Sequence, residues 1–396
     1  MKLQISILTY ATQTIIAGLC IAVMFATGAS AQLFETRAKQ AMLVDINTNS
    51  ILFSKDADAF VPPASLAKMM TMEVVFSALK SRQLSLEDEF IVSENAWRTG
   101  GAVSGGSTMF AELNSSIRLE DLIKGVIVQS ANDGCIIIAE GMAGSEELFA
   151  QLMTERAKKI GLTNSEFYNS TGLPHPDQKV TMRDLVTLTR YLQTEYPVYF
   201  KYYSMTSFTW NNITQRNRNP LFAMDIGADG MKTGFTEASG YAIVGSINRN
   251  GRRLVAAMSG LESQRSRAEE ARKMLQWGER AFEPFKIFDA GDVVGQVRLY
   301  GGAQLSVGVA PREELNIMVP LINRDKLKAR IVYNGPVATP VEEGAQIATL
   351  KVYIGDQLAQ EAPLYVIEDV GKGPIHRQAL DALTELFLGW ISKERA

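Results

Sequence analysis

The chain has 396 residues, of which 46% are hydrophobic and 21% charged, a composition typical of globular proteins and a length that suits two or three domains. Its formal net charge of −3 indicates no basic surface for a nucleic-acid partner. Only two histidines occur, His175 and His376, so chemistry that works without histidine is favoured over a Ser-His-Asp triad or a histidine zinc site.

The first 31 residues have the features of a signal peptide. Lys2 is their only charge, an apolar run centred on residues 15–25 follows, and Ala29-Ser30-Ala31 fits a small-residue cleavage site. We therefore expect residues 1–31 to be a signal peptide, with an uncleaved anchor as the alternative. The rest of the chain keeps one cysteine, Cys135, so no internal disulfide can hold an exported fold together.

Residues 32–290 show the pattern of an α/β domain with an antiparallel sheet and a helical subdomain. One hairpin is expected over residues 38–54 and a second over residues 240–260, where Asn250-Gly251 supplies the turn. Glycine and serine make residues 100–108 a candidate mobile loop. Helices are expected after Pro62-Pro63 and over residues 119–128, 135–143, 146–160, 181–192 and 266–282.

The pattern changes at about residue 291. Short apolar runs separated by glycine-containing turns predict a small all-β sandwich of antiparallel strands over residues 291–370. Residues 371–396 then contain a hinge and an amphipathic helix whose apolar face carries Leu380, Leu383, Phe387, Trp390 and Ile391. Such a helix suits a membrane interface, and docking on the protein's own surface or in a dimer is the alternative.

The sequence Ser65-x-x-Lys68 offers a nucleophile and a base. A serine hydroxyl needs a base within hydrogen-bond reach, and side chains three residues apart lie on the same face of a helix. Pro62-Pro63 suits the entry of a helix, which places Ser65 where backbone N–H groups and the helix dipole favour a developing negative charge. By itself, however, this spacing also occurs on ordinary amphipathic helices.

Two further motifs follow Ser65-Leu66-Ala67-Lys68 in the chain, namely Ser130-Ala131-Asn132 and Lys232-Thr233-Gly234. These three elements in this order form the signature of penicillin-binding proteins and class A β-lactamases. Together they predict a site for serine-based acyl transfer.

Each residue of the later motifs has a chemical use. Ser130 can pass a proton to a leaving amine, and Asn132 can hold the peptide chain of a substrate. Lys232 can lower the pKa of a neighbouring amine and attract a carboxylate, which Thr233 can bind by a hydrogen bond. Gly234 leaves room for a substrate backbone along the strand edge. Asp133 is expected to cap the helix that follows.

The chain resembles the low-molecular-mass penicillin-binding proteins, and among them the peptidase S11-like serine-type D-alanyl-D-alanine carboxypeptidases with a β-rich second domain and a C-terminal amphipathic anchor. The resemblance covers about residues 36–396. It is carried by Pro62-Pro63-Ala64-Ser65-Leu66-Ala67-Lys68-Met69-Met70-Thr71, Gln129-Ser130-Ala131-Asn132-Asp133, Phe167-x-Asn169-x-x-Gly172-Leu173, Asn217-Arg218-Asn219 and Asp229-Gly230-Met231-Lys232-Thr233-Gly234.

The resemblance implies a role for each matching residue. Ser65 would be the acyl-ester nucleophile, Lys68 the proton acceptor and Ser130 a second active-site hydroxyl. Lys232 would bind substrate, and Arg218 would contact its carboxylate side. The backbone N–H groups of Ser65 and Phe235 would form the oxyanion hole. Cys135 is expected to be a buried core thiol near the site.

The implied protein is a periplasmic hydrolase attached to the outer face of the inner membrane through its C-terminal helix. It would remove the terminal D-alanine from peptidoglycan pentapeptides, which limits cross-linking and affects cell shape. β-Lactams resemble D-Ala-D-Ala and would acylate Ser65. The resemblance implies no metal and no organic cofactor.

The sequence departs from the family pattern at two places. Phe235 stands where many relatives have histidine, and Ser259-Gly260-Leu261 stands where relatives often carry Gly-Gly-Arg. Three other functions remain open: a class A β-lactamase that uses Glu166 and Asn169 to activate water, a D,D-endopeptidase, and a weakly active wall-binding scaffold.

Overall fold

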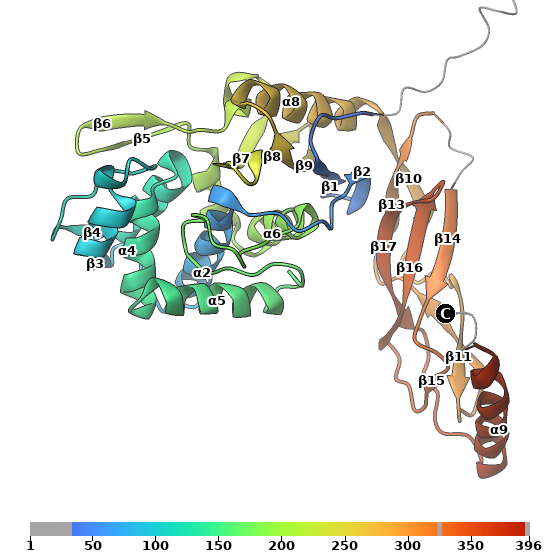
Figure 1. Ribbon diagram of the computed structural model, residues 1–396. Helices are drawn as coiled ribbons and strands as arrows, with labels where there is room; N and C mark the ends of the chain where they lie inside the picture. Colours follow the sequence, from blue (N-terminus) through green and yellow to red (C-terminus); the bar gives the residue numbers. More distant parts are fainter. Residues whose placement is uncertain (1–33, 323–326, 393–396) are drawn as a thin grey trace, which may run out of the picture. The chain divides into compact units, whose positions relative to one another are not determined.

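The computed structural model of the chain describes residues 34–322 and 327–392, so the expected signal peptide lies outside the described residues. The elements described below belong to the unit Thr36–Ala396. An α/β part with an antiparallel sheet comes first, a part made of β-strands follows, and a helix comes last (Figure 1). The predicted fold class is thereby confirmed.

A five-stranded antiparallel sheet is the centre of the α/β part. Its strands lie in the order β2-β1-β9-β8-β7. Both predicted hairpins are present, as β1–β2 and β8–β9. Strand β7 lies at the edge, which leaves one of its sides free for other contacts. The strands are β1 Gln40–Asp45, β2 Ser50–Lys55, β7 Ala228–Thr236, β8 Gly240–Arg249 and β9 Arg252–Leu261.

Helices cover both faces of this sheet. Helix α8, Gln264–Arg280, packs along β8 and β9 on one face, and helix α6, Met182–Glu195, packs against β1 and β9 (Figure 1). Because both faces are covered, the central strand residues are buried on both sides. Thr181 begins α6 as predicted, since its side chain accepts a hydrogen bond from Asp184 N.

The helical subdomain surrounds helix α2, Lys68–Lys80, which is buried along most of its length. Its other elements are β3 Glu89–Ile91, β4 Ser116–Arg118, α3 Leu119–Lys124, α4 Asn132–Ala143, α5 Glu146–Lys159, α7 Pro197–Phe200, β5 Ser207–Trp210 and β6 Ile213–Arg216. The segment predicted to be a mobile loop is partly ordered, because residues 96–100 and 102–104 form helical turns. Burial of Gly100 against α4 fixes the start of this segment.

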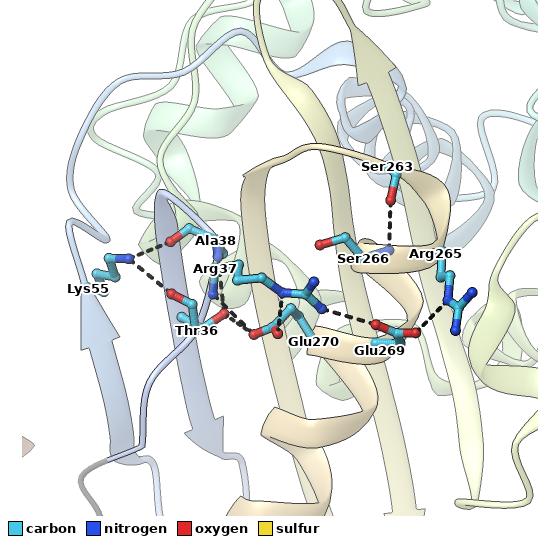
Figure 2. A network of polar contacts seen from close by, with 9 residues as sticks. All are labelled: Thr36, Arg37, Ala38, Lys55, Ser263, Arg265, Ser266, Glu269 and Glu270. Carbon is cyan, nitrogen blue, oxygen red and sulfur yellow. Dashed lines mark hydrogen bonds and ion pairs between the residues drawn. The ribbon is translucent and has the colours of Figure 1, made fainter.

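A network of polar contacts anchors the segment before β1 (Figure 2). The buried carboxylate of Glu270 on α8 accepts hydrogen bonds from Thr36 Oγ1 at 2.7 Å, Arg37 N at 3.2 Å and Arg37 Nε at 2.9 Å. Lys55 Nζ donates to the carbonyl oxygens of Thr36 and Ala38 at 3.2 and 2.7 Å. The network thus connects the beginning of the described chain to α8 and to β2.

The second part contains β-strands with a hydrophobic core of their own. One sheet has the order β14-β16-β17-β12-β11-β15, and β10 pairs with β13. One pair departs from the antiparallel prediction, because β11 and β15 are parallel. The strands are β10 Phe282–Phe288, β11 Gly295–Tyr300, β12 Ser306–Ala310, β13 Leu315–Pro320, β14 Leu327–Val332, β15 Val337–Ala338, β16 Gln346–Ile354 and β17 Gln357–Val366.

The last helix is α9, Ile375–Ser392. Asp381 Oδ2 accepts a hydrogen bond from Gly301 N at 2.8 Å, and Arg377 Nη1 donates to Ala303 O, so polar side chains hold the helix against the turn at 301–303. Leu380 and Leu383 are exposed. Among the helices that the structure describes, none is long and apolar enough to cross a membrane.

Candidate active site

Ser65 lies at the entry of α2. It belongs to a single 3-10 turn, Ala64–Ala67, that continues directly into α2. Ala64 has φ of 49°, a left-handed backbone conformation that redirects the chain just before Ser65. Lys68 Nζ lies 3.1 Å from Ser65 Oγ. The structure therefore places the two residues as the Ser-x-x-Lys spacing predicts.

Lys68 is buried and surrounded by oxygen acceptors. Its side chain is 1% exposed, and Nζ donates to Asn132 Oδ1 at 2.8 Å and to Thr171 O at 2.5 Å. A neutral amine has two N–H groups and one lone pair. With both N–H groups held by carbonyl oxygens, the lone pair faces Ser65 Oγ, which is the arrangement a general base needs.

Burial also sets the protonation state of this amine. It lowers the pKa of Lys68, and the positive charge of Arg218 lowers it further, while Glu146 and Asp133 act in the opposite direction. Burial raises the pKa of the nearby Cys135 to about 12, so this thiol stays protonated, as expected of a core cysteine. Lys68 is therefore the basic group that the site offers.

Ser130 and Lys232 form a second pair. Ser130 follows the turn Gly125–Gln129 with φ of 60°, which projects its hydroxyl toward Lys232, and Lys232 Nζ donates to Ser130 Oγ at 2.9 Å. Lys232 is 3% exposed. Burial lowers its pKa well below the ordinary value, and the charge of Lys68 adds to this effect. Each of the two serines is thus paired with one buried lysine.

Edge strand β7 brings the third motif to Ser65. A side chain on Gly234 would place its Cβ 3.1 Å from Ala64 Cβ and 3.3 Å from Ser65 N, so glycine permits the close approach. The next residue, Phe235, is half exposed, and its ring packs on Tyr241 with centroids 4.3 Å apart.

A cavity of about 480 Å³ opens beside Ser65. Most of the predicted residues line it, whereas Lys68, Asn132 and Lys232 lie in its walls behind the lining. Four lining residues, Ser107, Tyr241, Gln264 and Arg267, were not predicted. The lining consists of Ser65, Ser107, Ser130, Arg218, Thr233, Gly234, Phe235, Tyr241, Gln264 and Arg267.

Asp133 differs from its prediction as a helix cap. The N-cap of α4 is Ala131, without a side-chain cap, and the Asp133 carboxylate instead accepts hydrogen bonds from Thr108 Oγ1, Met109 N and Ala111 N at 2.6, 3.0 and 3.1 Å. The prediction was wrong because burial turns the carboxylate toward three unpaired donors of a neighbouring loop. That loop carries Ser107 to the cavity.

Arg218 lines the cavity beside Ser107 and contacts the same loop. Its Nη1 donates to Ser107 Oγ at 2.5 Å, and Ser107 O accepts from Asn132 N at 2.7 Å. The loop therefore connects Arg218 with the Ser-x-Asn motif.

Thr171 is a site residue that the sequence did not reveal as such. Asn169 Oδ1 accepts from Thr171 Oγ1 at 3.0 Å and from Gly172 N at 2.7 Å. Gly172 has φ of 79°, and a Cβ on it would lie 1.7 Å from Ala64 O, so no other residue fits without movement. The only available signal was the Asn169-x-x-Gly172 spacing, which marks the turn that presents Thr171 O to Lys68.

Arg267 comes from helix α8 and lines the cavity. It is 8% exposed, its guanidinium lies 5.6 Å from the centre of the Tyr241 ring, and its Nε has no hydrogen-bond partner among the described residues. The arginine that relatives often carry is replaced in this chain by Leu261, the last residue of β9. An amphipathic helix pattern does not distinguish Arg267 from the exposed arginines of α8.

Glu166 lies outside the cavity beside Ser65. Its carboxylate pairs with Lys179 at 3.2 Å, and it lines a separate hollow with Tyr168 and His175. Asn169 uses its side chain to hold the Thr171 turn. Neither side chain lines the Ser65 cavity, so the arrangement does not support the water-activating pair of a class A β-lactamase.

Two family patterns match the chain. The pattern of the peptidase S11 family, described as D-alanyl-D-alanine carboxypeptidase, matches residues 26–262. The pattern of the penicillin-binding protein 5 C-terminal domain matches residues 282–372.

Individual relatives match over nearly the whole chain. Identity is 34% over 370 residues to the D-alanyl-D-alanine carboxypeptidase DacC of Escherichia coli (strain K12), covering 93% of this chain and 92% of the relative. It is likewise 34% over 361 residues to the D-alanyl-D-alanine carboxypeptidase DacA of Haemophilus influenzae, covering 90% and 91%. The crystal structure of penicillin binding protein 5 from Haemophilus influenzae superposes with a TM-score of 0.71 at 33% identity, covering 86% of this chain and 99% of that structure.

Proposed function

Because the chain belongs to the D-alanyl-D-alanine carboxypeptidase family, peptidase S11, we propose that Ser65 is its nucleophile and that Lys68 is the general base. The protein is a serine-type D-Ala-D-Ala carboxypeptidase of the penicillin-binding protein 5 and 6 type. The observation that carries the assignment of the two residues is the buried Lys68 Nζ, held 3.1 Å from Ser65 Oγ by two carbonyl acceptors.

In the acylation step, Lys68 takes the proton of Ser65 as Oγ attacks the carbonyl carbon of the penultimate D-alanine. Negative charge develops on the carbonyl oxygen. The backbone N–H groups of Ser65 and Phe235 receive it, since Ser65 lies in the first turn of a helix and Gly234 brings the next strand residue close.

In the second half of acylation, the bond to the terminal D-alanine breaks and its nitrogen takes a proton. Ser130 donates that proton and is replenished from Lys68, while Lys232 Nζ, 2.9 Å from Ser130 Oγ, stabilises the oxygen during transfer. Water then hydrolyses the ester on Ser65, which releases the shortened peptide and restores the serine.

Substrate binding uses the cavity beside Ser65. Asn132 Nδ2 and the edge of β7 at Gly234 hold the peptide chain, as an extended peptide adds to a strand edge. The terminal carboxylate lies toward Thr233, Lys232 and Arg218. β-Lactams follow the same route and leave Ser65 acylated, which agrees with membership of a penicillin-binding family.

Acyl-enzyme mapping tests this assignment. The protein is incubated with benzylpenicillin, digested and analysed by mass spectrometry, with Ser130→Ala as a variant that keeps Ser65. We expect the adduct on the peptide that contains Ser65 in both proteins, with slower formation in Ser130→Ala because Ser130 protonates the leaving nitrogen. An adduct on a different serine in the native protein would contradict the proposal.

We also propose the domain limits and the location of the protein. Residues 1–31 are the signal peptide, 32–290 the catalytic domain, 291–370 the β-rich domain and 371–396 the anchor. Strand β10, at the end of the second range, pairs with β13 of the β-rich domain. The protein then works in the periplasm, peripherally bound to the outer face of the inner membrane. The exposure of Leu380 and Leu383 on α9 supports this, because these leucines remain exposed while Asp381 and Arg377 hold the helix by polar contacts.

A further inference from the structure

The turn that presents Thr171 O to Lys68 is held by successive peptide groups. In the group between Thr171 and Gly172, the N–H donates to Asn169 Oδ1 at 2.7 Å, and in a trans peptide the carbonyl points the opposite way, toward Lys68. In the preceding group, Ser170 O accepts from Thr71 Oγ1 at 2.6 Å. Thr71 lies one turn after Lys68 on α2, so neighbouring side chains of that helix contact neighbouring carbonyls of the turn.

The first peptide group of the turn is held by a charged residue. Glu146 Oε1 accepts from Ser170 N at 3.0 Å and from Ser170 Oγ at 2.6 Å. Ser170 and Thr171 are buried, and Glu146 is the first residue of α5, where the helix dipole favours a carboxylate. Glu146 therefore connects a rigid helix end to the backbone that carries the Lys68 acceptor.

We propose that Glu146 is a positioning residue, which holds Ser170 and thereby the Thr171 carbonyl so that the Lys68 lone pair points at Ser65. The proposal rests on the proposed function, in which Lys68 is the base. A tilt of the Thr171 carbonyl would let the amine rotate and turn its lone pair away from Ser65 Oγ, and misalignment of reacting groups by about 1 Å costs on the order of 100-fold in rate.

The charge of Glu146 has a second, separable effect. Lys68 is also faced by Asp133 and Cys135 on α4, by Arg218 and by Lys232 on β7. Glu146 raises the pKa of Lys68, as Cys135 and Asp133 also do, whereas Arg218 lowers it. Removing the charge of Glu146 lowers that pKa. Because only the neutral amine accepts a proton, the acylation rate rises with pH as Lys68 loses its proton, and we call this part of the profile the acid limb. A lower pKa of Lys68 moves the acid limb to lower pH.

The experiment measures the rate of acylation by a fluorescent penicillin from pH 5 to 10 on the purified protein and its variants. Glu146→Gln keeps an acceptor oxygen for Ser170 but loses the charge. We expect it to retain most of the plateau rate, with the acid limb moved to lower pH. Glu146→Ala loses both the acceptor and the charge, and we expect the same shift with a plateau about tenfold lower.

Glu147→Gln is the matched control. Glu147 is the next residue on α5, is exposed and does not contact Ser170, so we expect an unchanged pH profile. A Glu146→Ala plateau within about twofold of the native one would overturn the proposal. A Glu146→Gln plateau as low as that of Glu146→Ala would also overturn the proposal. It would show that the hydrogen bonds to Ser170 are not the means by which Glu146 affects the acylation rate.

Two further variants keep the test decisive. Thr71→Val removes the hydrogen bond to Ser170 O without a change of charge, so we expect a lower plateau with an unmoved acid limb, and an unchanged plateau would overturn the clamping of the turn. Thermal unfolding checks that each variant folds.

Lys68→Met separates this proposal from the proposed function. If Lys68→Met kept the native pH profile, the proposed role of Lys68 as the base would fail as well. If Lys68→Met were inactive and Glu146→Ala behaved like the native protein, only the role of Glu146 would be overturned.

Discussion

At the scale of single residues, the site depends on two buried lysines that cannot both carry a charge at low cost. Lys68 and Lys232 are both buried beside the cavity, and burial lowers the pKa of each. A lower pKa favours the neutral form that the proposed role of Lys68 as a base needs. Lys232 remains hydrogen-bonded to Ser130, where either protonation state can donate.

Arg218 provides a test of this electrostatic balance. Its charge lowers the pKa of Lys68, so Arg218→Gln should raise that pKa and move the acid limb of the acylation rate to higher pH. The pH profile with a fluorescent penicillin measures this. Arg216→Gln, at the end of β6, is the control, and an Arg218→Gln profile that matches it would contradict the balance.

Gly172 tests whether the turn behind Lys68 is as tightly packed as the contacts indicate. A Cβ there would lie 1.7 Å from Ala64 O, so Gly172→Ala must displace the backbone next to Ser65. We expect acylation at least about 100-fold slower, together with lower thermal stability. Gly161→Ala is the matched control, since Gly161 also has positive φ, 89°, but has open space around it. Equal effects of the two substitutions would show that packing against Ala64 does not matter.

How much of the site the sequence could predict depends on the kind of contact involved. Ser65, Lys68, Ser130 and Lys232 act through side chains within short motifs, and the structure brings them together. Thr171 acts through its backbone carbonyl, which no residue type signals. Arg267 reaches the cavity from a helix whose other face is exposed, a contact that depends on tertiary packing.

At the scale of elements, the contacts between α8 and the segment before β1 hold an active-site helix in place, because α8 also carries Arg267. Glu270 is 4% exposed and accepts three hydrogen bonds, whereas the neighbouring Glu269 is partly exposed (Figure 2). Burial alone would raise the pKa of Glu270, but the hydrogen bonds from Thr36 and Arg37 outweigh it and hold the pKa below the ordinary value.

Glu270→Gln should therefore lower the free energy of unfolding by about 1–2 kcal/mol at pH 7. A carboxyl group with a depressed pKa in the folded state stabilises the fold above its unfolded pKa, and that stabilisation is lost as the pH falls through the folded pKa. The difference between the variant and the native protein should thus shrink below about pH 4. Urea unfolding at both pH values measures it, with Glu269→Gln as the control. A difference that stays constant with pH would contradict a charged role for Glu270.

Most elements were predictable because their signals are local. The turn residues Asn250-Gly251 between two apolar runs predicted the β8–β9 hairpin, and Thr181 predicted the start of α6. The ordered turns at residues 96–104 were missed, because they are held by Gly100 packing on α4 and not by local propensity. The same applies to the parallel pair β11–β15, whose partners are far apart in the sequence.

At the scale of the whole molecule, the order of the parts was predictable from changes in composition and is matched by two family patterns in the same order. The expected signal peptide lies outside the described residues. Helix α9 is present, and Leu380 and Leu383 on it are exposed.

The proposed anchor role of α9 makes a direct prediction. Leu380→Glu combined with Leu383→Glu should weaken binding to vesicles of phosphatidylethanolamine and phosphatidylglycerol by more than about tenfold, since each buried leucine contributes about 1.5–3 kcal/mol. Release of D-alanine from a soluble peptide should not change. Ile91→Glu on β3, where Ile91 is 71% exposed, is the control for exposed apolar residues in general. Unaltered vesicle binding by the double variant would contradict anchoring by this face.

The account as a whole is tested most directly by release of D-alanine from diacylated L-Lys-D-Ala-D-Ala, measured beside labelling with a fluorescent penicillin in the native protein and in Ser65→Ala. We predict that the native protein does both and that both are lost together in Ser65→Ala. Release of D-alanine that persists in a folded Ser65→Ala would contradict the assignment of the nucleophile, and labelling without release would contradict carboxypeptidase action on this substrate.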